Sequence, residues 1–394
     1  MHKKINILGN KSITFAAIAL VIFGSLMIAS AEMGNSVGNT EYLSEVIIEQ
    51  VIFAVVGIVA YLVVMHLHIY RMKLSLFYFA YIVILGALVL CRFFGQTNGA
   101  YAWIRLGGIT VQPSEFAKIF LIIFGAKLLG TNHGEKNKEN FYRFAIMAFV
   151  YFFIIAFIQS DFGSAVVLFV ISFCICMIPP YKELRKIQKW MVIMVFAAIA
   201  GIFIMLSDPV TELMKSHSDN YMIGRFLAAA NPFLYRYDNG YHIIMALVSF
   251  ANGNIFGLGY GNSIHKYMNF PNPSNDFILP VIVEELGLIG FIGFIAAYCF
   301  LLVPLIIGSF KAKYISSKMI LLGVFTYFIV HFILNVGGVS AIIPLTGVPL
   351  LLISSGGSSL MASMIGLGLA QDELMRNKDK DNENNSREIQ ENAD

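Results

Sequence analysis

Residues 270–290 read FPNPSNDFILPVIVEELGLIG, a polar segment that runs directly into an apolar one. The apolar part continues to about residue 308, which exceeds the roughly 20 residues that an α-helix needs to cross a bilayer. The stretch therefore predicts a membrane-spanning helix with one carboxylate, Asp276, at the lip of the membrane. Because the rest of the chain is poor in charge, this carboxylate is the first candidate for a functional residue.

The composition of the whole chain agrees with a membrane protein. Its 394 residues are 58% hydrophobic and only 13% charged, and the mean hydropathy is +0.73. Soluble domains carry about 25% charged residues, so we expect an all-α polytopic membrane protein. Ten segments are long and apolar enough to be transmembrane helices; they lie near residues 13–31, 46–66, 75–94, 113–130, 143–159, 163–179, 190–206, 279–308, 317–335 and 351–370.

The Lys and Arg positions predict the orientation of these helices. If the N-terminus is cytoplasmic, the connecting segments on the cytoplasmic side hold most of the 27 basic residues, as the positive-inside rule expects. Both termini would then be cytoplasmic, and the net charge of +3 would reflect topology rather than binding to nucleic acid. The N-terminal apolar run resembles a signal peptide, but its length favours an uncleaved first helix.

The chain divides into three parts. We expect residues 1–12 to be a cytoplasmic N-terminus, residues 13–372 a ten-helix membrane domain, and residues 373–394 a charged, disordered tail. Residues 207–278 would form a large extracellular loop between the seventh and eighth helices. A loop of this length is usually functional, and its apolar patches, FLAAANPFLY and IIMALVSFA, predict short helices packed on the membrane face.

Polar side chains at the ends of two other helices are further candidates. The fourth helix opens QPSEFAKIF, in which Glu115 and Lys118 are three residues apart and can pair on one face. The pair either fixes helix packing or lines a cavity, and both interpretations stay open. Asp161, in the turn between the fifth and sixth helices, is either an N-cap or a site residue.

The segment before the fourth helix, GQTNGAYAWIRLGGITV, mixes glycines with Tyr101, Trp103 and Arg105. Aromatic residues of this kind are typical of a membrane interface. Arg92 and Arg105 are also among the few cations expected on the outer face. A pyrophosphate group bound there would need such partners.

Asp276 could cap the eighth helix, but Pro280 argues against this because proline lacks the N–H for a bond back to the cap. A helix that begins at Pro280 leaves Asp276 in the loop just outside. Glu284 and Glu285 follow within the helix, and two or three carboxylates near the outer lip could hold a proton or a divalent cation. The four cysteines lie in predicted helices as small buried hydrophobic residues, and the eight histidines are scattered without ligand spacing, so no His/Cys metal site is expected.

Two glycine-rich stretches need another explanation. The glycines of NGNIFGLGYGNS lack the strand–helix context of a dinucleotide fold and predict close approach to a neighbouring backbone or ligand. The stretch 335–366 breaks its helix at Pro344, Gly347, Pro349, Gly356 and Gly357. Non-helical backbone at membrane depth needs cover from protein or a water-filled cavity. We therefore expect a polar cavity beside the ninth and tenth helices, with tight helix packing as the alternative.

The ordered motifs of the chain resemble those of the SEDS family, the polytopic peptidoglycan glycosyltransferases that include FtsW, RodA and SpoVE. The resemblance covers about residues 13–372. It rests on Gly99-Ala100…Trp103-Ile104, Gln112-Pro113-Ser114-Glu115…Lys118, Gln159-x-Asp161-x-Gly163, Gly240-Tyr241, the glycines from 253 to 261, Asp276-Phe277-Ile278…Glu284-Glu285-Leu286-Gly287, and Pro344-x-Thr346-Gly347…Gly356-Gly357-Ser358-Ser359.

The resemblance implies polymerisation of lipid II on the outer face of the bacterial cytoplasmic membrane. Asp276 would be the general base that deprotonates the C4 hydroxyl of the acceptor sugar in an inverting reaction. A divalent cation (Mg or Mn) or basic side chains would neutralise the leaving pyrophosphate, and no organic cofactor is implied. The candidate binding residues are Arg92, Trp103, Arg105, Glu115, Lys118, Asp161 and Ser358, with Glu284 and Glu285 as supporting acids.

The chain departs from the family pattern beside Asp276. The usual Pro-Glu-x-His-Thr is here Pro271-Asn272-Pro273-Ser274-Asn275, which removes a Glu and a His. Elsewhere, Ala102 replaces a common basic residue, Ser160 replaces a proline, and His242 and Met245 replace glutamines. The aspartate itself is retained, so the enzyme interpretation stands.

The resemblance also implies partners. These are a class B penicillin-binding protein that supplies transpeptidation and other membrane proteins of the divisome or elongasome; nucleic acid is not implied. The details NGAYAWI, EELGLIG and SSGGSS favour an FtsW-like division protein over an elongation protein. Two alternatives are a lipid II flippase, which broken helices and intramembrane charges would suit, and a non-catalytic scaffold for a transpeptidase.

Overall fold

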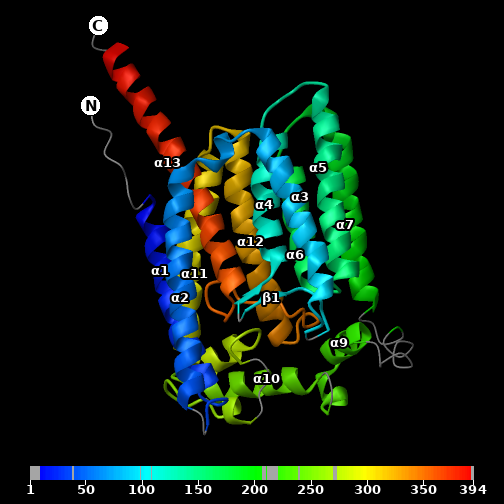
Figure 1. Cartoon of the computed structure of the whole chain (residues 1–394), viewed down its shortest axis with the longest axis vertical. Coiled ribbons are helices and arrows are strands. Elements are labelled where there is room, and N and C mark those ends of the chain that lie inside the picture. Colours follow the sequence, from blue (N-terminus) through cyan, green and yellow to red (C-terminus); the bar gives the residue numbers. More distant parts are fainter. Residues whose placement is uncertain are drawn as a thin grey trace.

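Long helices run side by side and form the body of the molecule (Figure 1). The computed structural model describes residues 9–37, 40–97, 99–107, 109–205, 210, 221–237, 240–268 and 273–391. The helices of the body are α1 (Lys11–Glu32), α2 (Thr40–Leu67), α3 (Leu74–Leu90), α4 (Pro113–Leu129), α5 (Lys136–Phe153), α6 (Phe162–Met177), α7 (Arg185–Met205), α11 (Ile278–Lys311), α12 (Ile315–Val339) and α13 (Gly357–Glu391). Each of the ten predicted segments overlaps one of these helices.

Within the described residues, six helical segments are long and apolar enough, by length and composition, to cross a membrane. They contain α1, α2, α3, α5, α11 and α12. Helices α4 and α6 are shorter, with 17 and 16 residues. The helical, multi-pass character of the protein is therefore confirmed, whereas the count of ten crossings stays a prediction.

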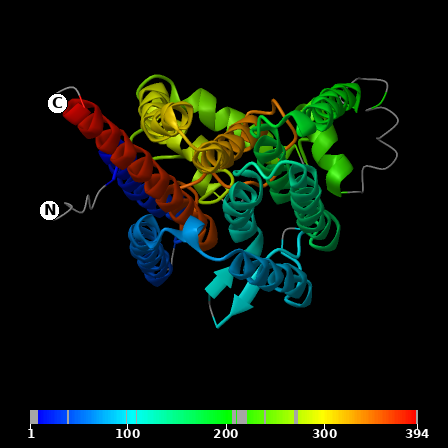
Figure 2. The ribbon, with the colours of Figure 1, turned by 90° about the horizontal axis from the view of Figure 1, so that it is seen from above.

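The centre of the bundle is formed by α4, α6 and α12, which pack against one another. Nearly all of α4 is buried, and the view from above shows α4 and α12 surrounded by other helices (Figure 2). Phe124 of α4 stacks on Phe77 and Tyr81 of α3, and Tyr81 stacks on Tyr151 of α5 with ring centroids 4.6 Å apart. Because lipid tails are as apolar as these side chains, close packing is what favours helix association here.

The segment between α3 and α4 forms a small hairpin that the sequence did not predict. Strands β1 (Ile104–Leu106) and β2 (Ile109–Val111) are antiparallel, with Arg105 opposite Thr110. Gly107 has a φ of +54°, a conformation that two-residue hairpin turns require. The hairpin follows the 3₁₀ turn η2 (Cys91–Phe93), which continues α3.

The segment between α7 and α11, here called the long loop, contains the short helices that its apolar patches predicted. They are α9 (Tyr221–Ala230), η6 (Pro232–Tyr235), α10 (Tyr241–Gly253) and η7 (His265–Tyr267). Helix α10 lies across one end of the bundle (Figure 1), which we call the α10 end. Residues 206–209, 211–220, 238–239 and 269–272 of this segment lie outside the described residues.

Helix α11 begins at Ile278, two residues earlier than the predicted start at Pro280. Pro280 is the third helical residue, where the N–H has no acceptor within the helix, so proline is tolerated. The helix is broken at Gly287, which has a φ of +67°. The backbone N–H groups of Leu258 and Gly259 donate to the carbonyls of Glu284 and Glu285 at 2.9 Å, and the long loop thereby satisfies the groups that the break leaves unpaired.

The glycines that precede this contact are explained by close backbone approach. A β carbon on Gly253 would lie 2.1 Å from the carbonyl oxygen of Val283, and one on Gly257 would lie 2.1 Å from that of Glu285. Both distances are shorter than any side chain allows. The predicted approach is therefore to α11, a neighbouring element of the same chain.

The connection between α12 and α13 is non-helical, as its prolines and glycines predicted. Helix α13 begins at Gly357, six residues after the predicted start at 351. Residues 350–353 are buried, and a β carbon on Gly24 of α1 would lie 2.6 Å from the carbonyl oxygen of Leu352. Protein therefore covers this irregular backbone, as required at membrane depth.

The charged C-terminal tail differs from the predicted disorder. Helix α13 continues through it to Glu391 and projects from the bundle (Figure 1). The first turn of the tail is attached to α12, because Ser317 Oγ donates to Glu373 at 2.5 Å and Arg376 donates to Ser317 Oγ at 2.7 Å. Most of the residues that follow are good helix formers or neutral, so a helix started by these contacts can continue. Residues 1–8 and 392–394 lie outside the described residues.

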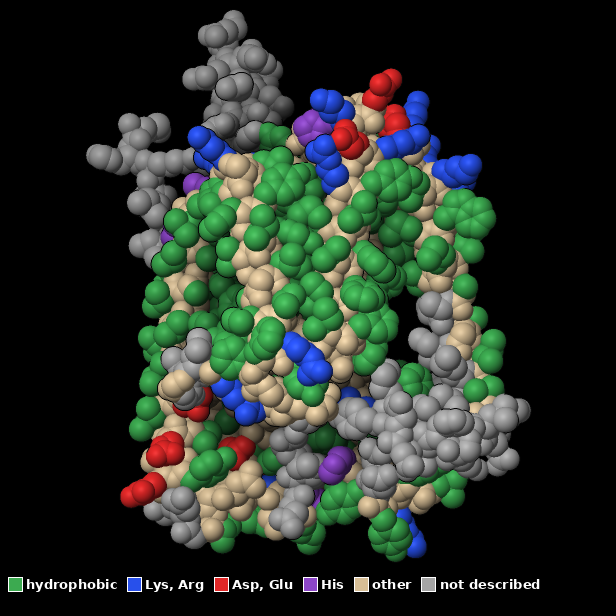
Figure 3. Space-filling model, turned by 45° about the vertical axis from the view of Figure 1, so that its right-hand side comes forward, with side chains coloured by type: hydrophobic (Ala, Val, Ile, Leu, Met, Phe, Trp, Pro, Cys, Tyr) green, Lys and Arg blue, Asp and Glu red, His purple; other side chains and the backbone are tan. Residues whose placement is uncertain are grey.

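Side-chain types are unevenly distributed along the bundle (Figure 3). Apolar side chains cover its middle, and Lys and Arg side chains gather at the end opposite α10, which we call the basic end. The connections between the helices at this end, together with the first residues of α5 and α7, carry Arg71, Lys73, Lys136, Lys138, Lys182, Arg185 and Lys313.

Candidate active site

Asp276 lies at the α10 end in a turn, Ser274–Asp276, that leads into α11. The N-cap of α11 is Phe277, and its side chain makes no capping hydrogen bond. The structure therefore agrees with a loop position for Asp276 outside the helix. Asp276 is partly exposed, although the nearby residues Ser274 and Phe277 are buried.

The backbone of this turn is fixed by three hydrogen bonds from two other elements. Ser355 N donates to the carbonyl of Ser274 at 2.8 Å, and Ser354 Oγ donates to that of Asn275 at 2.8 Å. Asn335 Nδ2 of α12 donates to the carbonyl of Asp276 at 2.9 Å. The broken α12–α13 connection and α12 thus set the position from which the Asp276 carboxylate extends.

Arg225 of α9 reaches the same place as Asp276. A β carbon on Gly347 would lie 3.5 Å from Asp276 Oδ2 and 3.8 Å from both terminal nitrogens of Arg225. Arg225 Nη1 also donates to the carbonyl of Leu345 at 3.0 Å. A carboxylate and a guanidinium therefore converge beside one glycine, Gly347, whose φ of +70° favours glycine at this position. The sequence alone did not single out Arg225; the one signal was a cation directly before the apolar patch FLAAANPFLY of the long loop.

The surroundings of Asp276 shift the titration of its carboxyl group toward neutral pH. Burial raises the pKa of its carboxyl group to about 6, the charge of Arg225 opposes this rise, and the charge of Asp161 adds to it. A carboxylate with a pKa near the working pH combines the deprotonated form with useful basicity. The geometry therefore suits a general base.

Asp161 acts as the N-cap of α6 and also contacts α4. Its Oδ1 accepts from Ser164 N at 3.0 Å, and its Oδ2 accepts from Gln112 Nε2 at 3.1 Å. The capping interpretation is confirmed, and the charge still acts on Asp276. Ser358 has a comparable positioning contact, because its hydroxyl accepts from Gln112 N at 2.9 Å at the start of α4.

Glu115 and Lys118 form an ion pair in the centre of the bundle. Lys118 Nζ lies 2.7 Å from Glu115 Oε1, and both side chains are fully buried. Tyr327 OH donates to Glu115 Oε2 at 2.9 Å, and His331 Nε2 lies 3.4 Å from Lys118 Nζ. The pair thus joins α4 to α12, and the interpretation that it fixes helix packing is confirmed. Its contact on α12, His331, lies four residues before Asn335. Its link to the Asp276 turn runs through α12.

Arg92, Trp103 and Arg105 stay within the segment between α3 and α4. Arg92 lies over the ring of Tyr101 at 3.8 Å from its centroid, and Arg105 donates to Thr97 Oγ1. Trp103 is partly exposed beside β1. These side chains lie near the α10 end, but the contacts described for them do not include Asp276.

Glu284 and Glu285 have a different role from the predicted acidic cluster. Glu284 lies 2.7 Å from His265 Nδ1 and accepts from Ser263 Oγ at 2.5 Å. Glu285 pairs with Lys266 at 2.9 Å and accepts from Ser30 of α1 at 2.7 Å. Both carboxylates thus attach the long loop to α11 and α1. Sequence spacing could not show this, because the partners come from segments that fold back onto the helix.

The side chains near Asp276 do not fit a metal ion held by the protein alone. Among the described residues, no three His, Cys, Asp or Glu side chains form a metal-binding group. The second carboxylate near Asp276 is Asp161, and the guanidinium of Arg225 occupies the same neighbourhood. A divalent cation there would need further oxygen ligands, such as the phosphates of a substrate.

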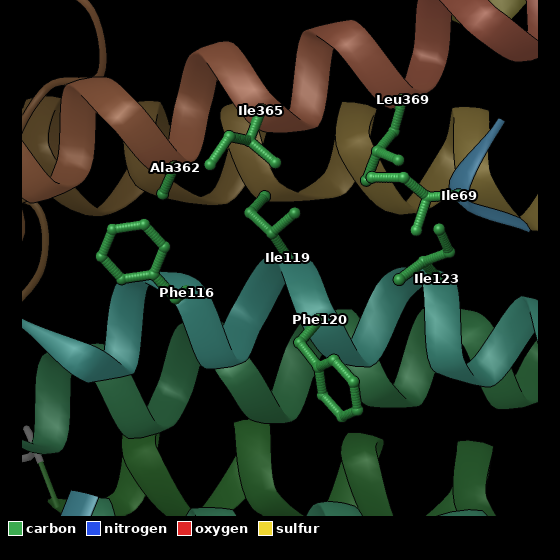
Figure 4. A pocket seen from close by; sticks show the side chains of 8 residues that line it. All are labelled: Ile69, Phe116, Ile119, Phe120, Ile123, Ala362, Ile365 and Leu369. Atoms are coloured by element: carbon green, nitrogen blue, oxygen red, sulfur yellow. The ribbon is translucent and has the colours of Figure 1, made fainter. Parts of the chain in front are cut away.

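An apolar groove of about 150 Å³ lies between α4 and α13. Side chains of the two helices point toward each other across it (Figure 4), among them Phe116 and Ile119 of α4 and Ala362 and Ile365 of α13. Ile69, in the connection between α2 and α3, closes the basic end of the groove. All eight lining side chains are apolar, so the groove suits a hydrocarbon chain.

Curated relatives match over most of the chain. The probable peptidoglycan glycosyltransferase FtsW of Bacillus subtilis is 28% identical over 364 residues, which cover 91% of this chain and 88% of the relative. The FtsW of Coxiella burnetii is 28% identical over 367 residues, covering 91% and 94%. The stage V sporulation protein E of Bacillus subtilis is 29% identical over 330 residues, covering 81% and 84%.

Two solved structures share the fold. A chain described under the structural coordination of polymerization and crosslinking by a peptidoglycan synthase complex has a TM-score of 0.71 at 23% identity, covering 93% of this chain and 98% of that one. RodA of Thermus thermophilus has a TM-score of 0.58 at 22% identity, covering 94% and 98%. The family model described as "Cell cycle protein" matches residues 10–378. Because that match spans nearly the whole chain, the protein belongs to the FtsW, RodA and SpoVE family of cell cycle proteins.

Proposed function

We propose that this protein is a peptidoglycan glycosyltransferase that polymerises lipid II, with Asp276 as general base. The single observation that carries the assignment is the Asp276 carboxyl group, with a pKa of about 6, beside the Arg225 guanidinium. The relatives named peptidoglycan glycosyltransferase, which match about nine tenths of the chain, supply the reaction class.

The reaction takes place at the outer face of the membrane. The basic end carries the Lys- and Arg-rich connections (Figure 3), which the positive-inside rule assigns to the cytoplasm. The α10 end, with Asp276, then faces outward. Helix α1 begins at the basic end and α13 ends beyond it (Figure 1), so both ends of the described chain are cytoplasmic under this assignment.

The chemistry follows from the positions of the two charges. The acceptor's C4 hydroxyl gives its proton to Asp276, and its oxygen forms a bond to the anomeric carbon of the donor sugar. The bond from that carbon to the undecaprenyl pyrophosphate breaks, and the pyrophosphate leaves with the electron pair as a stable anion. Arg225 lies where it can stabilise that developing charge. One displacement of this kind inverts the anomeric configuration.

The groove between α4 and α13 is the proposed place for part of a lipid tail. Its lining is entirely apolar, and it runs from the region of Phe116, one turn into α4, toward the basic end. A substrate with its sugars at the α10 end would extend its hydrocarbon chain in that direction. Mg²⁺ or Mn²⁺, if the reaction uses one, is expected to arrive with the substrate pyrophosphate, and no step here depends on it.

A class B penicillin-binding protein is the proposed partner. The matched solved chain belongs to a complex described as coordinating polymerization with crosslinking, and coupling the two activities needs such a transpeptidase. The FtsW relatives favour a role in division over elongation. Septal localisation of a tagged copy supports division, and side-wall localisation supports elongation.

The decisive experiment supplies lipid II in detergent to the purified full chain together with its transpeptidase partner. We expect glycan polymer from the wild type and at least about a 100-fold loss with Asp276→Asn, which removes the base but keeps the side-chain volume. The matched control is Asp372→Asn, at the basic end, which should polymerise normally. Flipping has no meaning in detergent, so polymer formation excludes a flippase as the sole activity. Full activity of Asp276→Asn contradicts the proposal and favours a scaffold.

A further inference from the structure

The turn that carries Asp276 has one anchor that the reaction scheme does not use. Ser274 Oγ, two residues before Asp276, donates to Glu32 Oε1. Glu32 is the last residue of α1, and both side chains are buried. The contact therefore joins the first helix of the chain to the candidate catalytic turn across more than 240 residues of sequence.

Glu32 is well placed to be rigid. Its second oxygen, Oε2, accepts from Asn35 Nδ2 at 2.8 Å and from Tyr42 OH at 3.0 Å. A buried carboxylate is costly unless hydrogen bonds satisfy its oxygens, and here both oxygens have donors. These contacts hold the carboxylate in one orientation, with Oε1 toward Ser274.

The end of α1 is itself docked on the long loop and on α11. Tyr260 OH donates to the carbonyl of Leu26 at 2.8 Å, and Ser30 Oγ donates to Glu285 at 2.7 Å. A β carbon on Gly34 would lie 1.9 Å from the carbonyl oxygen of Lys266, so the two backbones touch. Glu32 thus projects from a fixed support, and it can transmit that position to the Asp276 turn.

The contact also addresses a departure of this chain from its family. Ser274 stands where the family pattern has a histidine, and the neighbouring glutamate of that pattern is replaced by Asn272. We propose that Glu32 is a positioning residue for Asp276: through Ser274 it fixes the turn that aims the catalytic carboxylate. This inference rests on the proposed function of Asp276 and adds α1 to the machinery that serves it.

The test measures polymerisation by the purified full chain with its transpeptidase partner as a function of pH, for Ser274→Ala and Glu32→Gln. Loss of the anchor lets more water reach the partly exposed Asp276, so the pKa of its carboxyl group falls toward the ordinary value of about 3.9. The acidic limb of the kcat profile should shift to lower pH, and kcat at pH 7.5 should fall about 10-fold with KM changed less than about 2-fold.

Three further variants separate positioning from folding. Ser274→Thr keeps the hydroxyl and should restore both kcat and the acidic limb. Asn35→Ala removes one of the two hydrogen bonds that orient Glu32, so it should change kcat and the acidic limb in the same direction as Glu32→Gln, but by less. The double variant Glu32→Gln/Ser274→Ala should lose no more than Ser274→Ala alone, since both changes break one contact.

Two results overturn the inference. One is an unchanged pH profile and kcat in Ser274→Ala; the other is an equal loss in Ser274→Ala and Ser274→Thr with no shift of the acidic limb, which indicates a structural role only. The outcome is independent of the test of the proposed function. If Asp276→Asn remains active the base assignment fails, whereas an essential Asp276 with a wild-type profile in Ser274→Ala removes only the role of Glu32.

Discussion

Arg225 and Asp276 act on each other through charge, and this coupling gives the sharpest prediction for single residues. Arg225 opposes the rise in the pKa of Asp276 that burial causes. In Arg225→Ala the pKa of Asp276 should therefore rise above about 6. Because activity needs the ionised base, acidification should abolish it at a higher pH than in the wild type. Because the pyrophosphate also loses a partner, kcat/KM should drop about 100-fold. Arg225→Lys should keep the acidic limb near its wild-type position. A shift of the limb to lower pH in Arg225→Ala would contradict this arrangement.

Helix α11 depends on the long loop for the hydrogen bonds that its break at Gly287 leaves open. Gly257 has a φ of +76°, and a β carbon there would lie 2.1 Å from Glu285 O. Gly257→Ala should therefore displace the loop and lower the free energy of unfolding by about 2–4 kcal/mol. Gly293→Ala, on α11 itself but with open space around it, should have little effect. Melting temperatures in detergent measure both, and equal values for the two variants would show that the loop does not support the helix.

The whole molecule has a polar asymmetry that predicts its orientation in the membrane. Tyr237 of the long loop is 88% exposed at the α10 end, whereas Lys138 is exposed in the basic end. In a background without the four native cysteines, a cysteine at position 237 should react in intact cells with a membrane-impermeant maleimide. One at position 138 should react only after permeabilisation. The reverse pattern would place Asp276 in the cytoplasm and rule out polymerisation on the outer face.

Much of the architecture could be predicted because the bilayer constrains sequence strongly. A helix that crosses lipid must be apolar over about 20 residues, so the helices of the body were visible as segments, and helix breakers marked the α12–α13 connection. Local spacing also predicted the Glu115–Lys118 pair and the N-cap role of Asp161. Boundaries were less accurate, because a proline in the first turn of α11 costs no hydrogen bond and the tail extends α13 as helix.

The sequence by itself determined a multi-pass helical membrane protein and singled out Asp276, since a lone carboxylate at a membrane lip conflicts with its apolar surroundings. Only the tertiary structure decided which groups surround that carboxylate. Arg225 and Glu32 come from segments about 50 and 240 residues away, and Glu284 and Glu285, close in sequence, turn to Lys266 and His265 instead. The physical reason is that hydropathy is a property of each segment, whereas charge pairing and desolvation depend on which segments the packed helices bring together.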